Sequence, residues 1–149
     1  MRILLATDGS TQSLRAQRWL ASHLADFVPR PEVHLFHAHP PLPYPGAAAV
    51  VGRKAVEDYQ RDSAREALAP AAAALREAGV AFESGWSVGE PAAEIAGYVR
   101  DHAIDLVVLG ARGHGAVLNL ALGSVATKCI AILDVPVLVV PGTRGEGPA

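Results

Sequence analysis

Short apolar runs alternate along the chain with longer segments in which apolar residues recur at helical spacing. Continuous runs of Val, Leu and Ile are typical of strands that are buried on both faces of a parallel sheet. Apolar residues spaced three and four apart are typical of helices with one buried face. The pattern predicts strands at 3–6, 32–38, 80–88, 105–109 and 137–140, and helices at about 10–28, 48–78, 91–102 and 125–133.

Prolines and glycines divide these elements. Pro29 and Pro31 end the first predicted helix, and Gly79 ends the second. Four prolines within residues 39–46 predict a stiff, extended loop after the second strand. Pro70 predicts a kink or a break inside the second helix, near Ala69.

Two elements depart from a simple pattern. The apolar side of the first helix is interrupted by the polar residues Ser13 and Gln17. The third strand alternates imperfectly, with Ser84 among its apolar positions, which favours an edge strand over a central one. The apolar side of the first helix is expected to comprise Leu14, Leu20, Ala21, Leu24, Phe27 and Val28.

The strict alternation of strand and helix predicts one α/β domain over residues 1–142. We expect a single doubly wound, five-stranded parallel sheet in the order 3-2-1-4-5, with right-handed crossovers and helices on both faces, a Rossmann-like fold. Residues 143–149 are expected to form a frayed tail. In such sheets, ligands bind beyond the carboxyl ends of the strands, where the strand order reverses.

Composition and charge narrow the range of functions. Half of the 149 residues are hydrophobic. The net charge is −2 and no basic cluster occurs, and this charge pattern argues against a nucleic-acid partner. The single cysteine, Cys129, excludes an internal disulfide and suits a reducing compartment. The apolar run after Arg2 is too short for a signal peptide or a membrane span, so we expect a cytoplasmic protein without membrane contact.

The strongest chemical signal is the loop at 110–124, which follows the fourth predicted strand and precedes a Ser-headed helix. Glycines let the backbone approach an anion, and the first turn of a helix offers unpaired N–H groups and the positive end of its dipole. The loop is therefore predicted to hold phosphate. In the expected strand order it meets the end of the first strand, where Asp8 and Gly9 lie.

Two better-known phosphate loops are absent. A G-x-x-x-x-G-K-[ST] loop would need a lysine where Ala116 stands, and a G-x-G-x-x-G loop would need a glycine in place of Leu118. The spacing that fits is G-x2-G-x9-G-[ST], formed by Gly110, Gly113, Gly123 and Ser124.

With this motif the chain resembles the universal stress protein family, specifically its ATP-binding branch. The resemblance extends over nearly the whole chain. It is carried by Ile3-Leu4-Leu5-Ala6-Thr7-Asp8-Gly9-Ser10, His37-Ala38, Gly89-Glu90-Pro91, Asp105-Leu106-Val107-Val108-Leu109-Gly110 and Pro136-Val137-Leu138-Val139-Val140, together with the glycine motif.

The resemblance implies an ATP site, with ADP or AMP as possible ligands and Mg²⁺ bound through the nucleotide. It implies that Asp8 contacts the ribose or the phosphate-bound metal, and that the backbone of Ala38 reads the adenine edge. Gly110 and Gly113 would let the backbone wrap the ribose and phosphates, while Gly123 and Ser124 would hold the distal phosphates. The nucleotide-binding residues expected are Ala6, Thr7, Asp8, Ala38, Gly110, Arg112, Gly113, Gly123, Ser124 and Val125.

Simpler structural roles remain open for these residues. Asp8 could be only a turn or cap residue, and Ser124 only the N-cap of the last helix. Arg112 could clamp a phosphate or be a solvated loop arginine. Lys128 could face the phosphates or be an exposed helix lysine.

The histidines offer little support for metal binding. His34, His37 and His39 lie on or just after the second strand, but only His37 and His39 share a face, and no cysteine or carboxylate adjoins them. A zinc site is therefore disfavoured. His114, within the glycine loop, is the histidine placed to meet phosphate.

Three functions follow. The first is an ATP-dependent regulatory or stress-response protein, which the resemblance implies is a homodimer through the last strand, Val137 to Val140. In that case Gly123→Val should abolish ATP binding by projecting into the phosphate space. The second is a slow ATPase or adenylyl-transfer enzyme, although Asp8 and His114 are the only candidates to position water. The third is a dimeric interaction module with a vestigial nucleotide site.

Overall fold

The computed structural model describes residues 1–113 and 122–142 of the chain. The glycine-loop residues 114–121, His114 among them, and the predicted tail 143–149 lie outside the described residues. The strands are β1 (Arg2–Ala6), β2 (Glu32–His39), β3 (Phe82–Val88), β4 (Leu106–Gly110) and β5 (Val137–Val140). The helices are α1 (Thr11–His23), the 3₁₀ turn η1 (Leu24–Asp26), α2 (Ala47–Val51), α3 (Arg53–Glu77), α4 (Pro91–Asp101) and α5 (Ser124–Ile132).

The strands form one parallel sheet in the order β3-β2-β1-β4-β5. This confirms the doubly wound architecture and the strand order expected from the alternation of elements. It also confirms that the third strand lies at an edge. The chain crosses from β1 outward to β3, and then passes β1 again to reach β4, so the order reverses between β1 and β4.

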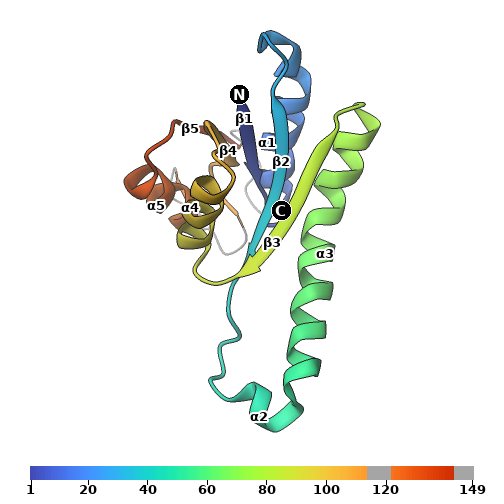
Figure 1. The fold of residues 1–149 in the computed structure, drawn as a ribbon, viewed down its shortest axis with the longest axis vertical. Coiled ribbons are helices and arrows are strands. Elements are labelled where there is room, and N and C mark those ends of the chain that lie inside the picture. Colours follow the sequence, from blue (N-terminus) through green and yellow to red (C-terminus); the bar gives the residue numbers. More distant parts are fainter. Residues whose placement is uncertain (114–121, 143–149) are drawn as a thin grey trace.

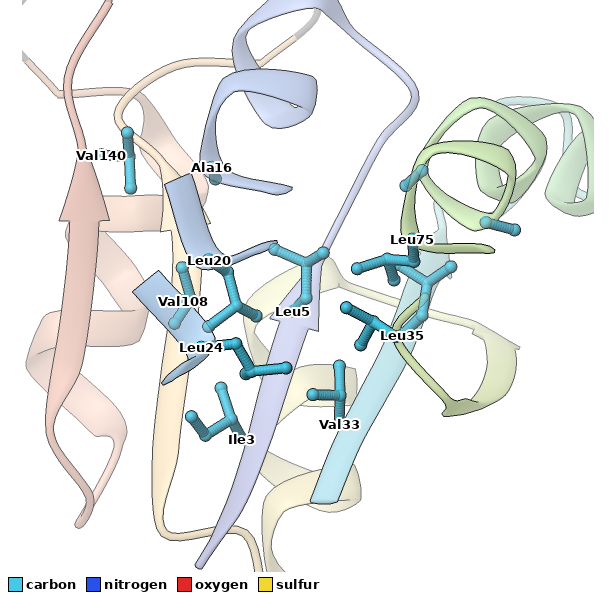
Figure 2. Close-up of a cluster of buried hydrophobic side chains, with 13 residues drawn as sticks. Ile3, Leu5, Ala16, Leu20, Leu24, Val33, Leu35, Leu75, Val108 and Val140 are labelled. Atoms are coloured by element: carbon cyan, nitrogen blue, oxygen red, sulfur yellow. The ribbon is translucent and has the colours of Figure 1, made fainter. Parts of the chain in front are cut away.

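Helices cover both faces of the sheet (Figure 1). On one face, α1 and α3 pack on side chains such as Leu5, Leu35 and Val108, which form the cluster drawn in Figure 2. On the other face, α4 and α5 pack on Leu4, Phe36 and neighbouring residues. Alternate residues of each strand therefore pack into the cores on opposite faces of the sheet. Both kinds of position are buried, which explains why the strands are unbroken apolar runs in the sequence.

The first helix is shorter than expected. α1 ends at His23 and η1 continues to Asp26, so the predicted helix over 10–28 is wrong in its last turn. Val28, expected on the buried side, is 90% exposed. The two polar exceptions, Ser13 and Gln17, are both buried, so tertiary packing overrides their polarity.

The long second helical region breaks at Gly52 and not at Pro70. Gly52 has a φ of 93°, which glycine adopts without strain, and it separates α2 from α3. α3 continues through Pro70, which is exposed. The third strand begins at Phe82, two residues later than predicted, because the Val80 N–H donates to the Leu75 carbonyl in the turn that ends α3.

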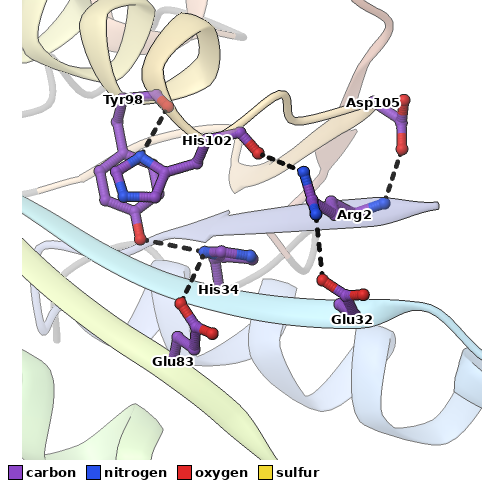
Figure 3. A network of polar contacts seen from close by, with 7 residues as sticks. All are labelled: Arg2, Glu32, His34, Glu83, Tyr98, His102 and Asp105. Atoms are coloured by element: carbon purple, nitrogen blue, oxygen red, sulfur yellow. Dashed lines mark hydrogen bonds and ion pairs between the residues drawn. The ribbon is translucent and has the colours of Figure 1, made fainter.

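The amino ends of the strands are joined by a polar network, shown in Figure 3. The Arg2 guanidinium donates to Glu32 and to the His102 carbonyl, and the Arg2 N–H donates to Asp105. The Tyr98 hydroxyl lies 3.0 Å from Nδ1 of His34. These contacts fix the edge of the sheet opposite the glycine loop. Within 1–113 and 122–142, the helices include none that is long and apolar enough to span a bilayer.

Candidate functional site

A cavity of about 540 Å³ lies beyond the carboxyl ends of β1, β2 and β4, where the strand order reverses. Its volume is in the range of small-molecule sites. The ten residues that the family resemblance implied for the nucleotide all line this cavity. They are Ala6, Thr7, Asp8, Ala38, Gly110, Arg112, Gly113, Gly123, Ser124 and Val125.

The turn after β1 is built by its own side chains. The Ser10 N–H donates to Oδ1 of Asp8 at 2.9 Å, and the Ser10 hydroxyl caps α1 by accepting from the Ser13 N–H. The Thr7 and Ser13 hydroxyls lie 2.9 Å apart. Asp8 therefore has the turn role that the simpler interpretation gave it, and it also lines the cavity.

His37, at the end of β2, is tied to the same turn. Its Nδ1 lies 2.8 Å from the Thr7 carbonyl oxygen, and the imidazole is buried. A carbonyl only accepts hydrogen bonds, so Nδ1 carries the proton and the ring is fixed in orientation. This places the backbone of Ala38 beside the end of β1, as the predicted site requires.

Gly110 has a packing role that the sequence did not reveal. A Cβ at this position would lie 2.8 Å from the Gln12 carbonyl oxygen and 3.3 Å from the Ser13 nitrogen. The end of β4 thus approaches the backbone of α1 directly. A Cβ on Gly113 would instead collide with the Asp8 carboxylate, so Gly113 brings the fourth-strand loop against the first-strand turn.

Gly123 is the N-cap of α5, and Ser124 is the first helical residue, so the interpretation of Ser124 as the N-cap is wrong. A Cβ on Gly123 would lie 3.3 Å from the Arg112 Cα and 3.4 Å from the Ala111 carbonyl oxygen. The valine of Gly123→Val would therefore start against the loop backbone, and the effect of this substitution on ATP binding stays a prediction. The first turn of α5, including Val125, faces the cavity with N–H groups that the helix itself cannot pair.

Among the residues lining the cavity, Asp8 and Arg112 carry the charges. Nε of Arg112 is buried and has no hydrogen-bond partner in the described part of the chain. A buried donor without a partner is costly, so the guanidinium is suited to an anion that enters the cavity. Arg112 as a whole is half-buried, so only part of its side chain is in contact with solvent.

Lys128 does not lie among the cavity-lining residues. Its ammonium donates to Glu90 at 2.9 Å, and that hydrogen bond, with a second from the Ala93 N–H, lowers the pKa of Glu90. Glu90 is also the N-cap of α4, so this ion pair joins the beginning of α4 to the middle of α5.

Metal binding and thiol chemistry would depend on the histidines and on Cys129. Residues 1–113 and 122–142 contain no group of three or more His, Cys, Asp or Glu side chains that could hold a metal ion. The rings of His37 and His39 are 5.9 Å apart. Burial raises the pKa of the Cys129 thiol to about 11, so this buried cysteine stays protonated at neutral pH.

The sequence missed one wall of the cavity. Tyr59, Ser63 and Ala67 of α3 line it, as do His37 and His39 of β2. The spacing of four between the α3 residues marks one helix face, and that was the available signal. Sequence alone could not tell which helix face would reach the carboxyl ends of the strands.

Comparisons with known proteins agree with this fold. Residues 1–141 match the profile of the universal stress protein family. The chain is 29% identical to universal stress protein MJ0531 of Methanocaldococcus jannaschii, over 97% of this chain and 84% of the relative.

Two solved structures with bound nucleotides are similar in fold. The universal stress protein of Archaeoglobus fulgidus in complex with dAMP has a TM-score of 0.64 and 23% identity, covering 93% of this chain and 96% of that one. A universal stress protein family protein of Arabidopsis thaliana with AMP bound has a TM-score of 0.68 and 18% identity, covering 100% and 96%.

Proposed function

The chain belongs to the universal stress protein family, and from that premise we propose that its cavity binds an adenine nucleotide, with ATP as the ligand. The observation that carries the proposal is the convergence of the predicted residues. Segments after β1, β2 and β4 and the start of α5, far apart in sequence, line one cavity at the switch point. The nucleotide-bound relatives from Archaeoglobus and Arabidopsis support this ligand class.

The charged and the neutral ends of the cavity lining suit different parts of a nucleotide, and this difference would orient it. At one end, the Arg112 guanidinium, the backbone at Gly113 and the first turn of α5 at Ser124 suit the phosphates. At the other end, Ala38 and its neutral surroundings suit the base. The Asp8 carboxylate fits an Mg²⁺ ion bound to the phosphates, since carboxylate oxygen is a ligand that Mg²⁺ prefers.

Isothermal titration with ATP, ADP and AMP, with and without Mg²⁺, tests the proposal. Arg112→Gln should weaken ATP binding about tenfold or more, because a charge-assisted contact to phosphate is lost. Arg100→Gln is the matched control, since Arg100 is an exposed arginine on α4 outside the cavity. Asp8→Asn should reduce the gain in affinity that Mg²⁺ gives. Undetectable binding of all three nucleotides to the wild-type protein would rule the function out.

We propose further that the bound nucleotide is held for regulation and not turned over. The carboxylate and imidazole groups in the described cavity lining are Asp8, His37 and His39. Oδ1 of Asp8 accepts from the Ser10 N–H, and Nδ1 of His37 donates to the Thr7 carbonyl, so one polar atom of each side chain already supports the turn. A phosphate-release assay with Mg²⁺-ATP should give a rate at background. A clear rate that disappears in Asp8→Ala would favour the slow ATPase instead.

We propose that the protein is a homodimer through β5. This strand is an edge of the sheet, and Ile130 and Ile132 of the neighbouring α5 are each 50% exposed. The carbonyls of Pro136 and Val140 accept hydrogen bonds from the β4 side, so alternation directs the Val139 N–H outward. Val139→Pro should therefore convert a dimer to a monomer in analytical ultracentrifugation. A monomeric wild type would contradict the proposal.

A further inference from the structure

One wall of the cavity has no role in the function proposed above. It consists of Tyr59, Ser63 and Ala67 on α3, with His37 and His39 at the end of β2. Residues spaced by four lie above one another on a helix, so α3 presents one continuous face to the cavity. This part of α3 lies beside the carboxyl ends of β2 and β3, and the helix continues past them toward α2 (Figure 1).

The position of α3 relative to the cavity is fixed by backbone contact. A Cβ on Gly9 would lie 3.0 Å from the Ala67 Cα and 3.1 Å from its carbonyl oxygen, so the turn after β1 touches the helix directly. Ala64 and Ala71 beside this contact are fully buried. Tyr59 lies two turns before Ala67, about 12 Å along the helix axis, and is therefore carried to the cavity mouth.

The α3 wall differs chemically from the phosphate end. The charged residues lining the cavity, Asp8 and Arg112, belong to the loops after β1 and β4. Burial and the neighbouring His37 lower the pKa of His39, which is therefore neutral at pH 7. A wall with aromatic rings and without a lysine, arginine or carboxylate is suited to a flat heterocycle.

Tyr59 is the residue of this wall that is best placed to meet a ligand. It is 56% exposed although it lines the cavity, and its ring packs edge-to-face with that of His39, with the centroids 6.2 Å apart and the planes at 70°. Nucleic-acid bases stack on aromatic faces of this kind with little dependence on sequence. We propose that Tyr59 packs against the base of the bound adenine nucleotide, with the His39 ring supporting it. This inference rests on the proposed function and adds the residue that recognises the base.

The test measures separately how much the base and the phosphates contribute to the binding affinity. ATP and ribose 5-triphosphate, which lacks the base, are titrated against the wild type, Tyr59→Ala and Tyr59→Phe. Tyr59→Ala should weaken ATP binding about tenfold and leave ribose 5-triphosphate unchanged, because a stacked aromatic contact is lost. Tyr59→Phe should bind ATP like the wild type. Tyr44→Ala is the matched control, since Tyr44 is 76% exposed in the neighbouring loop and does not line the cavity.

The outcomes are distinct. Wild-type ATP affinity in Tyr59→Ala would overturn the assignment, as would an equal loss of affinity for ribose 5-triphosphate, which would indicate a general effect on the site. A loss in Tyr44→Ala as large as that in Tyr59→Ala would also overturn it. A wild-type protein that binds neither ligand would instead contradict the proposed function itself.

Discussion

At the scale of single residues, the glycines of the motif serve the fold as much as the ligand. Gly110 lets β4 approach the Gln12 backbone, and Gly113 lies against the Asp8 carboxylate. Gly123 caps α5 and closes the loop, because its N–H donates to the Ala111 carbonyl. The glycine motif therefore lets the loop after β4 approach the turn after β1, and both segments line the cavity.

Gly110→Ala should destabilise the protein. Its Cβ would overlap the Gln12 carbonyl, and forcing extra volume into a packed interior costs about 1–3 kcal/mol. Gly97→Ala is the matched control, since a Cβ there meets nothing closer than the Arg100 guanidinium at 3.9 Å. It should stabilise α4 by about 0.5–1 kcal/mol. Urea denaturation measures both, and equal stability of the two variants would contradict the packing role.

His34 should make stability depend on pH. Burial lowers the pKa of His34 from its usual 6.5, and His102 and Arg2 act in the same direction, while Glu83 and Glu32 oppose them (Figure 3). The unfolded chain then binds more protons than the folded one near and below pH 6.5. The contribution of His34 is present above that pH and is lost as the pH falls.

The measurement is the free energy of unfolding between pH 8 and pH 5, from urea titrations. In His34→Asn, which keeps a polar group near the Tyr98 hydroxyl but cannot titrate, the decrease toward acid should be smaller than in the wild type. Identical pH profiles for the two proteins would show that His34 does not carry this dependence.

At the scale of elements, α3 contributes both to the hydrophobic core and to the wall of the cavity. Its second half buries Ala71 and Leu75 in the core, whereas its first half carries Tyr59 and Ser63 to the cavity. A single continuous helix links the two halves. Pro70 lies between the halves without interrupting them.

Pro70→Ala should raise stability. A proline inside a helix removes one backbone hydrogen bond and is about 3 kcal/mol less favourable than alanine, although relaxation of the helix around it reduces the gain. We expect an increase of about 1–2 kcal/mol in the free energy of unfolding, measured by thermal or urea denaturation. A loss of stability, or a loss of ATP affinity, would indicate that α3 needs Pro70 for its shape.

At the scale of the whole molecule, the two layers of helices enclose the sheet and leave its carboxyl edge open. The turn after β1, the end of β2 and the loop after β4 meet there because β1 lies at the centre of the sheet. The opposite edge is closed by the contacts of Arg2 with Glu32 and Asp105. The carboxyl edge of the sheet is therefore open to a ligand, whereas the polar contacts at the amino edge stabilise the fold.

The buried Cys129 should report on global unfolding. Its thiol is inaccessible, and burial raises its pKa to about 11, so it should not react with a thiol reagent such as DTNB in the folded protein at pH 8. Reaction should appear only as the chain unfolds, with a midpoint equal to that of circular dichroism. Rapid reaction without urea would show that α5 opens locally.

Much of this protein follows from local pattern. The alternation of apolar runs with helical segments predicted the strand order, and the imperfect alternation of the third strand predicted its edge position. The glycine spacing located the loop after β4, whereas the family resemblance implied the residues after β1 and β2 that line the cavity. The errors fall where packing competes with local preference. Val28 continues the helical spacing but is left in solvent, and the break in the second helical region falls at Gly52 and not at Pro70.

The sequence by itself determined the fold class and the location of the glycine motif, since both depend on spacing along the chain. The tertiary structure alone decided that α3 forms a cavity wall, that Gly110 lies against α1 and that Arg112 keeps a buried donor unpaired among the described residues. These facts depend on contacts between residues far apart in the chain, and no local pattern contains them.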